Sequence, residues 1–124
     1  MVTWYQARVL HGEKTGRTIG FPTVNLDPSV IPQDTEKGIY ASLVKINGKD
    51  YHGVLYFGPR LVKNETHDVL EIHVLEFAEE IYGDEISFSL EGFVRGVKNF
   101  ASLEELKEAI KLDVAKAREI LSDD

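Results

Sequence analysis

Four runs of alternating or β-branched residues fill most of residues 38–95, and they constrain the fold more than any other feature. Asn47-Gly48 between the first two runs is a strong hairpin turn. Short strands at this spacing, joined by Gly and Pro turns, are typical of a closed or nearly closed antiparallel barrel. We also expect an opening strand within residues 3–10. The four runs cover residues 38–46, 51–57, 69–77 and 85–95, and the last should place Ile86, Phe88, Leu90 and Val94 on one face.

The C-terminal segment has a different period. Ser102-Leu103-Glu104-Glu105 is a capping box, with Ser102 as the N-cap and Glu105 reaching back. Apolar residues then recur at helical spacing, which predicts a helix over residues 103–121 that packs on the barrel. The residues of this stripe are Leu103, Leu106, Ile110, Val114, Ala117 and Leu121.

Length and composition limit the class of protein. The 124 residues suit one domain, residues 1–124, and the absence of cysteine excludes thiol catalysis and thiolate-bound metals. A net charge of −7 argues against a general nucleic-acid binder. The sequence has no apolar run long enough to span a membrane and no signal-peptide core at its start. A single, cytoplasmic, soluble domain is therefore expected, without nucleic-acid or membrane partners.

Residues 12–25, GEKTGRTIGFPTVN, are the most informative segment. Gly12, Gly16 and Gly20 would let backbone N–H groups approach an anion, and the Arg17 guanidinium suits phosphate oxygens. The spacing matches neither a Walker A loop nor a dinucleotide fingerprint. From spacing alone, this segment could equally be a Gly-rich connection between strands.

Thr23 and Asn25 lie two residues apart after Pro22, which favours extended backbone, so their side chains should share a face. Hydroxyl and amide oxygens are hard ligands. Such a pair could complete a Mg²⁺ shell made mostly of water and substrate phosphates. The alternative is that both are turn residues that bond their own backbone.

Glu71 is the unusual residue of the 69–77 run. By alternation it shares a face with Val69, His73, Leu75 and Phe77, opposite three aliphatic residues. A carboxylate among apolar neighbours gains proton affinity and can act as a general base. The alternative is an ordinary surface carboxylate. His73 beside it is interpreted as a packing histidine.

Residues 94–100, VRGVKNF, form a basic and aromatic elbow before the helix. Arg95, Lys98 and Phe100 could hold a flat heterocycle with an anionic tail. The alternative is that this elbow only anchors the helix, with Phe100 as an apolar residue near its cap.

Taken together, these segments resemble the riboflavin kinase family, including the kinase module of bifunctional FAD synthetases. HGEKTGRTIGFPTVNL resembles the family's Gly-rich loop and its GRxxGFPTxN signature, and GIYASLVKINGKDYHGVLYFG resembles the hairpin that follows. LEIHVLEFAEEIYGDEISF and RGVKNFASLEELKEAIKLD resemble the two later family segments. The resemblance spans roughly residues 7–121, and four segments in the same order are far more specific than any one of them.

The resemblance implies a mainly β fold, a six-stranded antiparallel Greek-key barrel with a C-terminal α-helix. It also implies transfer of the ATP γ-phosphate to the 5′-hydroxyl of riboflavin, giving FMN and ADP, with Glu71 as the catalytic base. Mg²⁺ would lie at Thr23 and Asn25. Nucleotide-binding positions would be Gly12, Arg17, Thr23, Val74, Glu76, Tyr82 and Gly83, and flavin-binding positions would be Arg95, Lys98 and Phe100.

Some positions depart from the family pattern. Ala7 and Lys14 stand where the family usually has Gly, and Pro59-Arg60 stands where it often has Pro-Thr. The sequence shows no adenylyltransferase domain, so FAD synthesis by this chain alone is not expected. The Met at residue 1 favours a stand-alone protein over the alternative of an excised domain, and we expect a monomer. The alternative is a catalytically silent module that binds flavin or nucleotide, and the intact Thr23, Asn25 and Glu71 argue against it.

Overall fold

The computed structural model describes residues 2–10, 21–59, 67–77, 79 and 81–122. In this part of the chain, short strands make up the first three quarters and a single long helix ends it. The strands are β1 (Tyr5–Arg8), β2 (Val24–Leu26), β3 (Gly38–Ile46), β4 (Lys49–Pro59), β5 (Asp68–Val74), β6 (Glu85–Phe88) and β7 (Gly92–Gly96). A short 3₁₀ turn, η1 (Pro28–Val30), follows β2, and α2 (Leu103–Leu121) is the helix.

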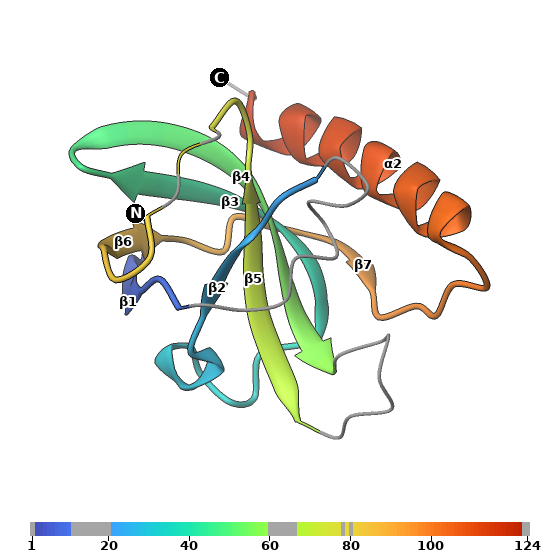
Figure 1. Ribbon diagram of the computed structural model, residues 1–124, viewed down its shortest axis with the longest axis horizontal. Coiled ribbons are helices and arrows are strands. Elements are labelled where there is room, and N and C mark those ends of the chain that lie inside the picture. Colours follow the sequence, from blue (N-terminus) through green and yellow to red (C-terminus); the bar gives the residue numbers. More distant parts are fainter. Residues whose placement is uncertain (1, 11–20, 60–66, 78, 80, 123–124) are drawn as a thin grey trace.

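The strands form one antiparallel sheet in the order β1-β6-β3-β4-β5-β2, and β7 also pairs with β3. The two ends of this order meet, because the Leu10 N–H just after β1 donates to the Asn25 carbonyl of β2 at 2.7 Å. The result is a nearly closed six-strand barrel with a helix on its outside (Figure 1). The predicted fold class is confirmed.

The predicted hairpin is present as expected. Asn47 and Gly48 join β3 to β4 with φ values of 51° and 80°, the positive φ pair of a type I′ turn. The strand predicted over residues 69–77 is shorter in the structure and ends at Val74. Its end is explained by Glu76, which has φ of 60° and turns the chain away from β4.

The single strand predicted over residues 85–95 is wrong, because the structure divides it into β6 and β7. Both parts pair with β3, but between them the buried Ser89 accepts the Leu43 N–H through its hydroxyl at 3.1 Å. A side-chain oxygen thus replaces a backbone carbonyl in the ladder. The regular pairing stops there, and the expected common face of residues 86–94 is interrupted.

Two apolar clusters hold the molecule together. The larger fills the barrel and includes Leu55, Phe57, Ile72 and Phe88, each 1% exposed or less. The smaller lies between the outside of the barrel and α2, where Ala117 is fully buried. Figure 1 shows α2 along one side of the barrel, with β7 leading through a loop into its first turn.

The predicted helix bounds and cap are confirmed. Ser102 Oγ accepts the Glu105 N–H at 3.2 Å, and Glu105 Oε1 accepts the Ala101 N–H, one residue before the N-cap. Leu103, the first residue of the predicted apolar stripe, is half exposed, whereas Val114 and Leu121 pack on the barrel.

Within the residues that the structure describes, no helix is both long and apolar enough to cross a membrane.

Candidate active site

Five residues from five strands form one row across the sheet. In the strand register, Asn25 lies opposite Glu71, Glu71 opposite Tyr56, Tyr56 opposite Ile39, and Ile39 opposite Arg95. Directly paired residues point to the same face of a sheet. Leu70 and Ile72, on either side of Glu71, are buried inside the barrel, so the row lies on the outer face. The row therefore places residues predicted for metal, catalysis and flavin on one surface.

Thr23 and Glu71 are in contact although 48 positions separate them in the sequence. The Thr23 hydroxyl donates to Glu71 Oε1 at 3.2 Å in a partly buried position. Asn25 follows two residues later on β2, directly opposite Glu71. The pairing of β2 with β5 thus brings Thr23 and Asn25 to the carboxylate that the alternation pattern singled out.

His73 holds the turn that leads into this contact. Its Nδ1 bonds to the Pro22 carbonyl at 2.8 Å, and the Phe21 ring meets the imidazole edge-to-face with centroids 5.4 Å apart. The interpretation of His73 as a packing histidine is confirmed. Because Pro22 precedes Thr23, this contact also limits where the Thr23 hydroxyl can lie.

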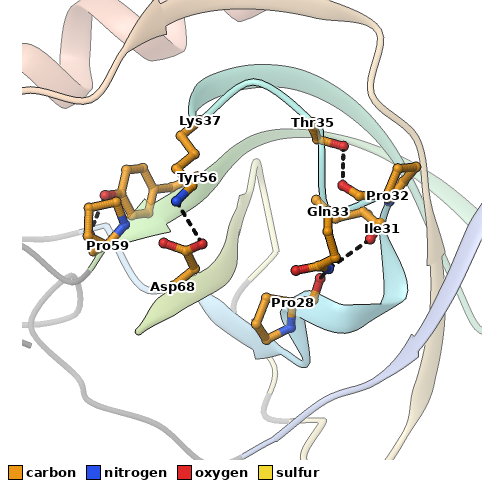
Figure 2. Close-up of polar contacts among 9 residues, drawn as sticks. All are labelled: Pro28, Ile31, Pro32, Gln33, Thr35, Lys37, Tyr56, Pro59 and Asp68. Atoms are coloured by element: carbon orange, nitrogen blue, oxygen red, sulfur yellow. Dashed lines mark hydrogen bonds and ion pairs between the residues drawn. The ribbon is translucent and has the colours of Figure 1, made fainter. Parts of the chain in front are cut away.

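Tyr56, the central residue of the row, was missed by sequence reasoning. Its hydroxyl donates to the Pro59 carbonyl, and the Lys37–Asp68 ion pair at 3.0 Å lies beside it (Figure 2). Burial raises the pKa of Tyr56 to about 12, the negative charges of Glu71 and Asp68 add to this shift, and Arg95 opposes it. Tyr56 therefore stays protonated near neutral pH and is influenced by both charged residues of the row.

Of the four nucleotide positions expected after Glu71, Val74 ends β5, Glu76 lies in the turn that follows, and Tyr82 and Gly83 lie in a later turn before β6. Val74 is 4% exposed in the barrel core, so only its backbone could face a ligand. Tyr82 packs partly buried against the same core. Gly83, with φ of 86°, donates its N–H to the Val9 carbonyl at 2.8 Å, and its own carbonyl accepts from Arg8. This turn thus lies against the end of β1.

Gly12, Lys14 and Arg17 lie outside the described residues. The nucleotide and phosphate roles expected of Gly12 and Arg17 therefore stay predictions from the sequence.

Arg95 is held by the helix. Its Nε and Nη2 each donate to a carboxylate oxygen of Asp113 at 2.8 Å, and Asp113 is 3% exposed. The guanidinium lies 5.5 Å from the Phe100 ring centroid, and the Lys98 ammonium lies 5.7 Å from it. The structure thus brings the three predicted flavin positions together, with Asp113 as a fourth member that sequence reasoning missed. A charged residue between Ile110 and Ala117 on the apolar stripe was the available signal.

An open groove of about 430 Å³ runs beside this cluster. Its lining residues combine an aromatic and an aliphatic surface with charged groups at the start of α2. They are Lys98, Phe100, Glu104, Glu105, Glu108, Ala109 and Leu112.

The donor set at the row's other end suits a magnesium ion. Thr23 and Asn25 supply neutral hard oxygens beside the carboxylate that Thr23 bonds, and Mg²⁺ usually takes few protein ligands plus water and substrate phosphates. Among the described residues, no three His, Cys, Asp or Glu side chains gather in a way that could hold a metal by themselves. A metal here would therefore depend on the nucleotide for much of its shell.

The comparisons with known proteins identify the family. A family model described as riboflavin kinase matches residues 3–121. The bifunctional riboflavin kinase/FMN adenylyltransferases of Escherichia coli K12 and Haemophilus influenzae are 40% and 39% identical to it over 113 and 114 residues, each match covering 90% of this chain. The chain belongs to the riboflavin kinase family. It spans 36% of the length of those two relatives.

Solved structures share the fold. The riboflavin kinase of Trypanosoma brucei superposes with a TM-score of 0.70 at 25% identity, covering 97% of this chain and 80% of that one. A Streptococcus pneumoniae structure named as a macrolide-efflux protein superposes with a TM-score of 0.79 at 26% identity, covering 94% of this chain and 38% of that one.

Proposed function

We propose that this chain is a riboflavin kinase, which transfers the γ-phosphate of ATP to the 5′-hydroxyl of riboflavin. The family membership supports the reaction, and the row Asn25–Glu71–Tyr56–Ile39–Arg95 supports the assignment of roles. Neighbouring strands lie about 4.8 Å apart, so Glu71 and Arg95 are separated by roughly 14 Å along the sheet. That separation suits a substrate whose flat ring and reacting hydroxyl lie at opposite ends.

Glu71 is the proposed general base. It would accept the proton of the 5′-hydroxyl as that oxygen bonds to the γ-phosphorus, while the bond from the γ-phosphorus to the bridging oxygen breaks and ADP leaves with the electron pair. The Thr23 hydroxyl, 3.2 Å from Glu71 Oε1, orients the carboxylate. Proton acceptance of this kind contributes about 10²- to 10⁴-fold in rate.

The remaining acceleration would come from positioning and charge neutralisation, since phosphoryl transfer requires little covalent chemistry from the protein. Thr23 and Asn25 would hold a Mg²⁺ ion. When bound, that ion neutralises phosphate charge. Gly12 and Arg17 would contact the phosphates, and Val74 (through its backbone), Glu76, Tyr82 and Gly83 would lie along the nucleotide.

The flavin ring is proposed to occupy the groove beside Phe100 and Lys98. Phe100 contributes an aromatic side chain to the groove lining, and the groove's volume of about 430 Å³ is in the range of sites for small ligands. Arg95 does not line the groove. Its proposed contribution to flavin binding is therefore indirect.

The surroundings of the reaction are also proposals. With a net charge of −7 and no nucleic-acid signature, the chain is proposed to act in the cytoplasm as a monomer on small molecules. The macrolide-efflux name of the pneumococcal structure is not carried over, because the match covers 38% of that chain.

The direct test mixes the purified chain with riboflavin, ATP and Mg²⁺ and resolves the products by chromatography. FMN that forms with ATP and disappears with a chelator is the expected result. Riboflavin binding without FMN would instead indicate a silent flavin module, and neither binding nor FMN would refute the proposal.

A further inference from the structure

Asp113 is the most deeply buried charged side chain of those described. It lies on α2, facing the barrel, with 3% of its surface exposed. Both carboxylate oxygens accept from Arg95 of β7, each at 2.8 Å, in the two-pronged geometry that suits a planar guanidinium. This contact joins the helix to the strand that leads toward the groove.

The rest of the Arg95 guanidinium extends the contact. Its Nη1 donates to the Gly96 carbonyl at 3.2 Å, so the plane of the group is held on three sides. The central carbon of the guanidinium lies 5.5 Å from the centroid of the Phe100 ring. The Lys98 ammonium lies 5.7 Å from the same centroid. A cation over an aromatic face is attracted by it. The Phe100 ring is therefore located by a guanidinium that Asp113 fixes.

Fold stability alone gives little reason for a buried ion pair at this position. Apolar residues of similar volume often replace such pairs without loss of stability. The geometric consequence is more specific, because Phe100 lines the groove together with four residues from the first turns of α2, namely Glu104, Glu105, Glu108 and Ala109. One ion pair thus fixes both walls of the groove relative to each other.

We propose that Asp113 is a positioning residue for riboflavin binding, which acts through Arg95 to fix Phe100 against helix α2. This inference rests on the proposed function, since it takes the groove to be the flavin site. Asp113 touches neither substrate nor reacting atoms. Its loss should weaken flavin binding while leaving the Thr23–Glu71 side of the row unchanged.

The test compares Asp113→Asn with Glu119→Gln, which makes the same carboxylate-to-amide change at an exposed position of the same helix. For Asp113→Asn we expect riboflavin KM to rise on the order of tenfold, because a charged hydrogen bond is lost. ATP KM should stay within about twofold of wild type. Glu119→Gln should match wild type in both. Riboflavin binding by flavin fluorescence, without ATP, should show the same loss.

Two further variants cover the case in which Asp113→Asn does not fold. Arg95→Lys changes the less buried partner of the pair. It keeps the positive charge but loses the two-pronged contact with Asp113, and it should show the same rise in riboflavin KM. Arg95→Met/Asp113→Leu replaces the ion pair with two apolar side chains. This double variant should keep the wild-type free energy of unfolding but bind riboflavin more weakly than wild type.

Wild-type riboflavin KM in folded Asp113→Asn or in the double variant would overturn the positioning role. A parallel rise of riboflavin and ATP KM would also overturn it, since that pattern indicates general loosening. These outcomes leave the proposed kinase reaction intact. A wild-type chain that neither binds riboflavin nor makes FMN would refute both proposals.

Discussion

A carboxylate lies at each end of the cross-strand row, Glu71 near the β2 end and Asp113 of α2 against Arg95, and the two are bonded in different ways. Thr23 contacts Glu71 through a neutral hydroxyl at 3.2 Å, in a partly buried position on the outer face. Asp113 is buried and takes two 2.8 Å bonds from a guanidinium. Both oxygens of Asp113 are taken up by the guanidinium fork, so this carboxylate ties β7 to α2. The proposed chemistry therefore lies at the β2–β5 end, and the proposed ligand positioning lies at the β7–α2 end.

The largest expected effect is on turnover, and it comes from a change at Glu71 near the β2–β5 end of the row. Glu71→Gln keeps the shape of the side chain but removes its basicity, so kcat for FMN formation should fall by about 10²- to 10⁴-fold. Riboflavin binding should not change. Glu91→Gln, an exposed carboxylate in the β6–β7 connection, is the control and should be active. Turnover of Glu71→Gln at the wild-type rate would show that Glu71, near the β2–β5 end, is not the catalytic base.

The second prediction concerns Gly38 of β3, where an added side-chain atom would clash with β7. A Cβ on Gly38 would lie 2.2 Å from the Arg95 carbonyl oxygen and 2.9 Å from the Phe93 ring, so β7 would have to move. Gly38→Ala should lower the free energy of unfolding by about 2–3 kcal/mol.

The matched control for that change is its pairing partner. Gly96 lies opposite Gly38, and a Cβ there would meet nothing within 4 Å. Gly96→Ala should change stability by no more than about 0.5 kcal/mol. Urea unfolding of both variants measures the difference, and equal losses would contradict the crowding that the structure shows.

A smaller effect is expected at Thr23, beside the proposed Mg²⁺ and nucleotide site. Thr23→Ala removes the hydroxyl that bonds Glu71 and is proposed to face Mg²⁺, so KM for MgATP should rise about tenfold. Thr23→Ser should restore it. Thr35→Ala, which removes a hydroxyl bonded to the Pro32 carbonyl at 2.6 Å, is the control and should have no effect on KM (Figure 2). A normal KM for Thr23→Ala would remove Thr23 from the site.

The last effect depends on pH and concerns Tyr56, between the two ends. Its pKa is raised to about 12 from 10.0, so the folded chain binds this proton more tightly than the unfolded chain does. Its contribution to stability is therefore complete below pH 10 and is lost as pH rises toward 12. Tyr56→Phe should reduce the fall in stability between pH 10 and 12. An unchanged fall, measured by urea unfolding across that window, would contradict the shift.

Local signals were sufficient for much of this fold. Asn47-Gly48 and the Ser102 cap depend on neighbours in sequence, and both appear as predicted. Glu71 could be selected because alternation places it outside the barrel core. The break between β6 and β7 could not be predicted from the sequence, because it depends on a hydrogen bond from the Leu43 N–H to Ser89, 46 positions away.

The candidate site was predicted in parts rather than as a whole. The sequence indicates Thr23, Asn25 and Glu71 separately. Only strand register places Asn25, Glu71 and Tyr56 in one row, and only the fold brings the Thr23 hydroxyl to Glu71. Arg95 was expected to contact flavin, whereas the structure shows its guanidinium bonded to Asp113, which is 18 positions away. The helical period places Asp113 on the apolar stripe, but a single sequence does not show which residue of β7 it pairs with.

The row also makes enzyme activity a reporter of sheet alignment. Its five residues come from five separate strands, so all five strands must pair in the correct register before the surface exists. A slip of one residue in β5 would turn Glu71 into the barrel and bring an aliphatic side chain to the outside. A misaligned but compact barrel would then keep its secondary structure and lose its turnover, so an assay for FMN would distinguish the two species where circular dichroism would not.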